Sequence, residues 1–225
     1  DFGNDRKSHN KKPTIVGNAY HLPTGDSVSL PTNSRVKSNL RQKHTLGFLH
    51  LISNCPDFYP KFGLRKKDTE EFFSDIDQYK DEQIFAITEY DYSRSLWALH
   101  KWINESSDRV LSDRIGIEPG DMHRIVEVAE WLAFSLYEIA KLLRRRDLLP
   151  EIQNLRLRIK HGVKEELLAL VRLKGIGRVR ARSLFAAGFS DPIKIAKAAD
   201  AQLSAVSNIG PGIAKSIKEQ LQTKN

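Results

Sequence analysis

The sequence has few of the residues that build covalent cross-links or metal centres. Cys55 is the single cysteine, which excludes a disulfide within the chain and fits a reducing compartment. Seven histidines and Cys55 show no metal-ligand spacing, so no metal site is expected. No apolar run approaches the roughly 18 residues that a membrane span needs, and the first residues lack the apolar core of a signal peptide. We therefore expect a soluble, cytoplasmic chain without a membrane partner.

The sequence also lacks the motifs of an ATP-driven motor. No Gly-x-x-x-x-Gly-Lys-[Ser/Thr] segment occurs, so no loop is available to cradle the phosphates of ATP. Residues 81–84 read Asp-Glu-Gln-Ile and miss the last residue of an Asp-Glu-x-His box. Neither the clustered acids of a nuclease nor the pocket acid of a glycosylase is evident. We expect the chain alone to carry no catalytic residue, to bind no cofactor and to hydrolyse no ATP.

Positive charge is abundant and unevenly distributed. The net charge is +8. Residues 151–225 contain 14 Lys and Arg against 6 Asp and Glu, which leaves 36 − 14 = 22 basic and 28 − 6 = 22 acidic residues before them. The whole surplus therefore lies in the last third. Such an asymmetry is typical of a protein with a polyanionic partner, and the plainer alternative is a solvated basic face.

Helical periodicity dominates after a polar beginning. With 40% hydrophobic and 28% charged residues, the chain can bury a core. Residues 1–32 are polar and predict a loose lead-in or the remnant of another domain. Apolar residues then recur at helical spacing over 40–52, 69–77 and 91–104, and no alternating strand pattern of useful length follows residue 32.

The clearest expected helix covers residues 118–143. Acidic residues and a proline suit its amino end, and three arginines suit its carboxyl end. One apolar stripe is formed by Ile125, Ala129, Leu132, Leu136, Ile139 and Leu143. We interpret the charged segment 151–160 as a linker. The expected fold is all-α, with a helical bundle at 33–150 and a small domain at 161–225.

Two glycine turns in the last domain resemble each other. They lie in residues 173–184 and 208–217, each between two helical patterns, and resemble a tandem helix-hairpin-helix. Glycines allow a tight turn, and the amides of the helix that follows favour an anion such as a phosphate. The residues assigned to this DNA-binding surface are Lys174, Gly175, Ile176, Gly177, Arg178, Arg180, Arg182, Gly210, Gly212 and Lys215. The alternative is a helix–helix turn without a ligand, above all for the second turn.

Arg124 and Trp131 share a face of the long helix. They lie two turns apart, and this face points roughly 120–140° away from the apolar stripe. A tryptophan there is typical of a platform on which a nucleic-acid base stacks, with the guanidinium beside it. The alternative is that another helix covers Trp131.

Four segments, at 44–57, 102–105, 120–132 and 155–163, together resemble the ratchet domain and following region of archaeal Ski2-type (Hjm-type) superfamily-2 DNA helicases. The resemblance implies a parent enzyme that uses ATP and Mg²⁺ to unwind DNA in the 3′-to-5′ direction at stalled or forked replication structures. It implies that Arg124 and Trp131 contact bases of the translocating strand.

The same resemblance implies that the terminal hairpin domain grips the emerging strand through Lys174, Arg178, Arg180 and Arg182. It also implies that residues 1–32 are the tail of a winged-helix domain, and that helicase motor domains are partners, whether or not they belong to the same polypeptide.

The leading hypothesis is therefore a DNA-binding accessory portion of a helicase that acts on single-stranded or forked DNA in replication-fork repair. One alternative is a protein-interaction scaffold like the related modules of Ski2/Sec63-like RNA-processing helicases. Another is a stand-alone helix-hairpin-helix DNA repair protein.

Overall fold

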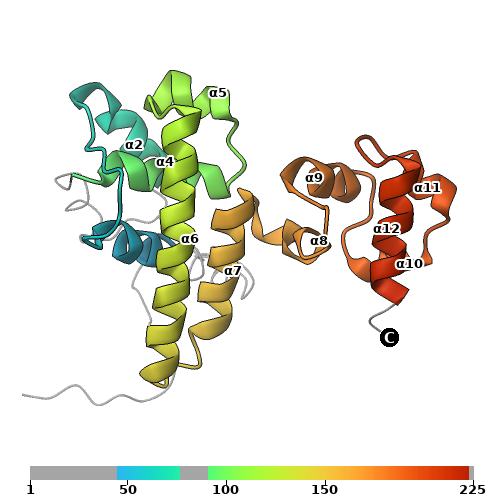
Figure 1. The fold of residues 1–225 in the computed structure, drawn as a ribbon. Coiled ribbons are helices and arrows are strands. Elements are labelled where there is room, and N and C mark those ends of the chain that lie inside the picture. Colours follow the sequence, from blue (N-terminus) through green and yellow to red (C-terminus); the bar gives the residue numbers. More distant parts are fainter. Residues whose placement is uncertain (1–44, 77–90, 223–225) are drawn as a thin grey trace, which may run out of the picture.

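The computed structural model describes residues 45–76 and 91–222 (Figure 1). Every regular element in these two ranges is a helix, which confirms the expected all-α class. The predictions for residues 1–32 and for the Asp-Glu segment at 81–84 lie outside the described residues.

The helices form two units along the chain (Figure 1). The bundle contains a helix that includes residues 45–54, then η1 (Lys66–Asp68), α2 (Thr69–Ile76), α4 (Ser93–Ile103), α5 (Asp108–Val110), the π-helical turn η4 (Leu111–Ile115), α6 (Pro119–Leu142) and α7 (Leu149–His161). The hairpin unit contains η5 (Glu165–Leu167), α8 (Leu168–Val171), α9 (Arg178–Ala186), α10 (Pro192–Lys197), α11 (Asp200–Ser204) and α12 (Pro211–Gln222).

The core of the bundle is centred on α4, which is buried along most of its length. Trp97 packs edge-on against Phe72, with ring centroids 5.9 Å apart. The indole nitrogen of Trp97 donates a 2.8 Å hydrogen bond to Asp75, and Lys101 forms an ion pair with the same carboxylate at 2.6 Å. The polar atom that the ring brings into the core is thereby satisfied.

The long helix α6 buries only part of its predicted apolar stripe. Ile125 and Ala129 are fully buried, but Ile139 is 52% and Leu143 is 68% exposed, so the prediction is wrong for the carboxyl half. The reason lies in the length of the helix. The carboxyl half of α6 extends past most of the bundle and is flanked mainly by α7 (Figure 1). In that half Ala140 is buried instead.

The segment predicted as a linker, 151–160, is a helix. It makes up most of α7, whose first turn contains Pro150, a residue that suits that position. Ile152, Leu155 and Ile159 recur at helical spacing and are buried against the bundle core, while the charged residues between them stay nearer the surface. Charge and proline marked the amino end and outer face of this helix, not a junction without structure.

The chain leaves the bundle at Gly162, the residue that caps α7. Its φ of +61° is left-handed, and a Cβ there would lie 2.5 Å from the ring of Trp102. A glycine is therefore required by both backbone and packing. Beyond it, the hairpin unit has its own aliphatic core, which includes Leu170, Leu203 and Ile217.

Candidate nucleic-acid interface

The first glycine turn joins α8 to α9. The amide of Ile176 donates to the carbonyl of Leu173 at 3.0 Å, and the side chain of Ile176 is buried. Gly175 has a φ of +83°, and the carbonyl of Gly177 accepts the first hydrogen bond of α9 from Ala181 at 2.9 Å. The turn is thus anchored in the core by its isoleucine.

The second turn repeats these features between α11 and α12. Ile209 is buried and donates to the carbonyl of Val206 at 3.0 Å, and Gly210 accepts from Ala214 at 3.0 Å. Asn208, with a φ of +65°, takes the left-handed conformation that Gly175 has in the first turn. Asparagine tolerates that conformation better than most residues.

The glycines of the two turns stand 35 residues apart, which pairs Gly175 with Gly210 and Gly177 with Gly212, but the structure pairs them differently. Gly210, not Gly212, corresponds to Gly177, because each precedes the first residue of its helix. Gly212 lies within the first turn of α12. The repeat is therefore real, but its register is two residues away from the simple pairing of Gly175 with Gly210.

Three of these glycines have no reason within the fold to be glycine. A Cβ added at Gly177, Gly210 or Gly212 would meet no atom within 4 Å, and none of the three has a left-handed φ. No side chain at these positions therefore hinders an anionic group from approaching the first amides of α9 or the amide of Gly212 in α12, where Pro211 has no N–H and the amide of Ile213 bonds to Gly210.

A shallow hollow of about 480 Å³ lies at the amino end of α9. It is lined by Gly177, Arg178, Val179, Arg180 and Asn208, so it joins the first turn to the second. Arg180 bridges the two turns, since its guanidinium donates to the carbonyls of Gly175 at 2.8 Å and Asn208 at 3.3 Å. The two turns thus present one continuous surface.

The other two arginines of α9 reach the bundle. Arg178 donates to the carbonyl of Ser106 at 2.6 Å, and burial lowers its pKa against the opposing effects of Glu105 and Asp108. Arg182 contacts Glu105 at 2.6 Å and Glu166 at 3.0 Å. Burial acts to lower the pKa of Arg182, but the hydrogen bonds with the two carboxylates raise it overall.

The two lysines assigned to this surface are exposed. Lys174 is held by its backbone, whose amide and carbonyl both bond to the side chain of Gln220 at 2.7 and 3.0 Å. Lys215 lies in the first turns of α12, with its ammonium 4.0 Å from Glu219. The predicted basic residues therefore divide into lysines directed to solvent and arginines bound within the protein.

Arg124 and Trp131 both lie on an exposed face of α6, and Trp131 is 54% exposed. The alternative in which another helix covers this indole is not what the described residues show. Ser135, one turn further, donates to the carbonyl of Trp131 at 3.3 Å. The face is open to a flat ligand.

The carboxyl end of α6 has an exposed apolar strip of Ile139, Leu142 and Leu143, and the sequence had assigned two of them, Ile139 and Leu143, to the core. Phe134 is also exposed, on another side of the helix. The guanidinium of Arg156 lies 4.8 Å from the ring of Phe134 and covers it in part. The three arginines after Leu143, which suit the carboxyl end of the helix, also indicate that this end lies in solvent.

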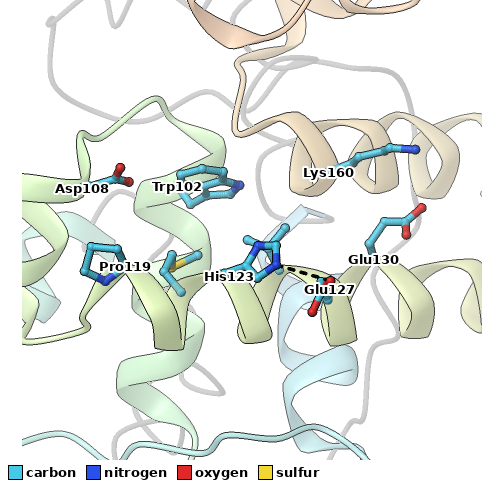
Figure 2. Close-up of a pocket in the computed structure, with 9 residues that line it drawn as sticks. Trp102, Asp108, Pro119, His123, Glu127, Glu130 and Lys160 are labelled. Atoms are coloured by element: carbon cyan, nitrogen blue, oxygen red, sulfur yellow. Dashed lines mark ion pairs between the residues drawn. The ribbon is translucent and has the colours of Figure 1, made fainter.

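A pocket of about 400 Å³ lies beside the amino half of α6. His123, Glu127 and Glu130 project into it from α6, whereas Trp102 comes from α4 and Lys160 from α7 (Figure 2). His123 and Glu127 are 3.4 Å apart (Figure 2). The carboxylates at its rim make this pocket unsuited to a phosphate.

Within the described residues, no cluster of three or more His, Cys, Asp or Glu side chains could hold a metal ion. None of the helices there has both the length and the apolar character to cross a bilayer.

Comparison with known proteins matches both units. Residues 46–162 match the family described as archaeal helicase, domain 4, and residues 166–223 match the SAM-like helix-hairpin-helix tandem. The chain is 40% identical over 189 residues to the ATP-dependent DNA helicase Hel308 of Pyrococcus horikoshii. The aligned residues make up 80% of this chain and 26% of the relative. It is 37% identical over 213 residues to Hel308 of Pyrococcus abyssi, covering 90% of this chain and 29% of the relative.

Hel308 of Methanocella arvoryzae is 34% identical over 190 residues, which are 79% of this chain and 25% of the relative. The chain thus spans about a quarter of the length of these relatives. The first family match ends at Gly162, where α7 ends, and the second covers the hairpin unit. The resemblance to an archaeal Ski2-type helicase is confirmed, and the chain belongs to the archaeal helicase domain 4 family, followed by a helix-hairpin-helix tandem.

Proposed function

We propose that this chain is the DNA-handling, non-catalytic portion of an ATP-dependent DNA helicase, and that it binds single-stranded and forked DNA. The parent enzyme moves 3′ to 5′ and acts in the repair of stalled replication forks. ATP and Mg²⁺ bind in its motor domains, and this chain binds neither. With DNA as the proposed substrate, the location that we propose is the cytoplasm. The relatives named above, ATP-dependent DNA helicases, support the proposal.

The observation that carries the proposal is the pair of open helix ends in the hairpin unit. Gly177 leaves the first amides of α9 uncovered, Gly210 does the same for the amide of Gly212 in α12, and Lys174 and Lys215 are exposed in the same two segments. Amides and ammonium groups in this arrangement bind sugar-phosphate oxygens without reading the sequence. Binding of this kind weakens steeply as salt rises, because bound phosphates release their counterions.

The exposed face of α6 supplies the second contact. Trp131 offers its ring to a base, and Arg124 stands two turns away on the same face. Stacking on such a ring is worth roughly 1–3 kcal/mol per base and is insensitive to sequence. It requires an unstacked base, so the preferred DNA has single-stranded character.

The apolar strip of α6 supports the presence of motor domains as partners. Ile139 and Leu142 are too exposed to contribute to the core of this chain. Because the chain spans about a quarter of its relatives' length, the remaining domains of such a helicase are suited to cover them.

Fluorescence anisotropy with labelled forked, single-stranded and duplex DNA, and with RNA of the same sequence, tests the proposal. Forked and single-stranded DNA should bind most tightly, with affinity falling as salt rises. Trp131→Ala should weaken strand binding by roughly 5- to 150-fold, the equivalent of 1–3 kcal/mol. Its free energy of unfolding should change by less than about 0.5 kcal/mol, because the ring is exposed.

Phe134→Ala is the matched control, since it removes another exposed aromatic ring from the same helix. It should leave strand affinity within roughly twofold of the parent. Parent-like DNA binding by Trp131→Ala, together with a large loss of stability, would contradict the stacking role.

A second candidate function is a protein-interaction scaffold. The exposed strip of Ile139, Leu142 and Leu143 favours it. It predicts that residues 1–225 bind little DNA at physiological salt and acquire function only in complex with another protein. The same anisotropy measurement separates the two candidates.

A further inference from the structure

The carboxyl end of α4 gathers guanidinium groups from both units. We call residues 104–107, which follow Ile103, the acceptor loop. Arg158 of α7 donates to the carbonyl of Ile103 at 3.3 Å, and Arg178 of α9 donates to that of Ser106 at 2.6 Å. A helix carboxyl end has unpaired carbonyls and a partial negative charge, so cations are favoured there.

Glu105 is the charged centre of the acceptor loop. Its carboxylate accepts two hydrogen bonds from Arg182, at 2.9 and 2.6 Å, and one from the amide of Lys164 at 3.4 Å. Its φ of +68° is rare for a residue with a side chain and is held only where surrounding contacts determine it. Glu105 thereby links the end of α4 both to α9 and to the start of the hairpin unit.

Arg178 makes a second contact with the bundle, at the ring of Trp102. Its guanidinium lies 5.0 Å from the centroid of the Trp102 ring, a cation–π arrangement. That ring is fixed by its own hydrogen bond to the carbonyl of Ile159 at 2.8 Å and by the close approach of Gly162. The hairpin unit therefore meets the bundle at a surface that is already ordered.

We propose that Glu105, Arg178 and Arg182 form a clamp that fixes the hairpin unit on the bundle. In this role Arg178 and Arg182 are positioning residues for DNA binding and not phosphate contacts. The clamp sets where the open amides of α9 stand relative to Trp131. The statement about DNA rests on the proposed function, whereas the clamp itself does not.

The bonding of the three α9 arginines supports this division of roles. Arg182 has carboxylates of Glu105 and Glu166 at 3.0 Å or less, so its charge is already compensated. A phosphate could bind it only in competition with both. Arg180, by contrast, donates to the carbonyls of the two turns, which belong to the hairpin unit itself. It is the natural control for loss of an arginine from the same helix.

Distances between two spin labels, measured by double electron–electron resonance, test the clamp without DNA. Cys55 is the single cysteine, so a Cys55→Ser background allows labels at Lys141→Cys on α6 and Ser216→Cys on α12. The parent should give one narrow distance distribution. Glu105→Ala and Arg182→Ala should broaden it to a similar extent, and the double variant should be no broader than either, because both remove one interaction.

Arg180→Ala should leave the distribution narrow, which separates the clamp from general loss of charge on α9. Narrow, parent-like distributions for both Glu105→Ala and Arg182→Ala would overturn the clamp. This result does not depend on whether the chain binds DNA.

Forked-DNA titration then separates positioning from phosphate contact. Under the proposal, Glu105→Ala and Arg182→Ala weaken binding by a similar factor, on the order of three- to tenfold, and leave the salt dependence unchanged. If Arg182 contacts phosphate, its loss weakens binding and reduces the salt slope by about one, whereas loss of the acidic Glu105 does not weaken binding. That pattern would overturn the positioning role. Absence of DNA binding by the parent would instead contradict the proposed function.

Discussion

The bundle and the hairpin unit bury their apolar residues in different ways. Large rings fill the bundle core, where Phe58, Phe72, Tyr92 and Trp97 are fully buried. The buried core of the hairpin unit is aliphatic, and its phenylalanines are only partly buried around it. A large core lets the bundle leave one face of a long helix exposed. The small unit instead uses short helices, and their ends become its surface.

The largest expected effect concerns the aromatic core of the bundle. Trp97→Ala removes the ring that contacts Phe72 and the hydrogen bond to Asp75. It should lower the free energy of unfolding by about 3–5 kcal/mol. Ile195→Val, a small truncation in the core of the hairpin unit, should cost only about 0.5–1.5 kcal/mol. Urea unfolding followed by circular dichroism measures both, and equal losses would remove the contrast between the two cores.

Acid should destabilise the bundle selectively. Burial lowers the pKa of His100 to about 4; Asp75 opposes this, and Arg158 and Lys101 add to it. Burial also lowers the pKa of His50 and His161. A histidine whose pKa is lower in the folded state takes up its proton mainly on unfolding, so stability falls as pH drops below about 6.5. For His100 alone the loss between pH 7.5 and pH 5 is about 2 kcal/mol.

Tryptophan fluorescence isolates this effect, because Trp97, Trp102 and Trp131 are the three tryptophans of the chain and all belong to the bundle. Residues 163–225 contain no histidine. His100→Gln should remove most of the pH dependence of the fluorescence-detected unfolding. An unchanged pH dependence in that variant would show that other groups cause it.

Two glycines of the hairpin unit should respond differently to alanine. At Gly175 the left-handed φ makes a side chain strained, so Gly175→Ala should cost about 1–2 kcal/mol of stability. At Gly210 a Cβ meets nothing, so Gly210→Ala should change stability by less than about 0.5 kcal/mol. The new methyl group would stand near the open amide of Gly212 in α12 and should weaken DNA binding by roughly tenfold. Tight DNA binding by a stable Gly210→Ala protein would argue against phosphate contact at this turn.

Much of the fold follows from local pattern. The helices predicted at 69–77, 91–104 and 118–143 correspond closely to α2, α4 and α6, because capping residues and apolar spacing act within a few turns of the chain. The prediction of a linker at 151–160 is wrong because its charges outweighed three apolar residues at helical spacing. Whether such residues become buried depends on a partner helix, here α6, that local pattern does not specify.

The candidate site, like the fold, could be predicted from the sequence only in part. The isoleucines that anchor the turns, Ile176 and Ile209, could be predicted, since an apolar residue directly before the last glycine of a polar turn has few other roles. The partners of Arg178 and Arg182 could not. Their carbonyl and carboxylate acceptors lie on residues far away in the sequence, and charge alone suggested a nucleic-acid contact for every arginine of α9.

The sequence by itself determined the all-α class, the two glycine turns and the shared face of Arg124 and Trp131. These depend on backbone preferences and on helical periodicity, which act over short separations. Only the tertiary structure decided that Trp131 stays exposed, that the carboxyl half of α6 lies in solvent, and that Glu105 holds Arg182. Each of these depends on which distant segments pack together, because burial and charge pairing are properties of the assembled chain.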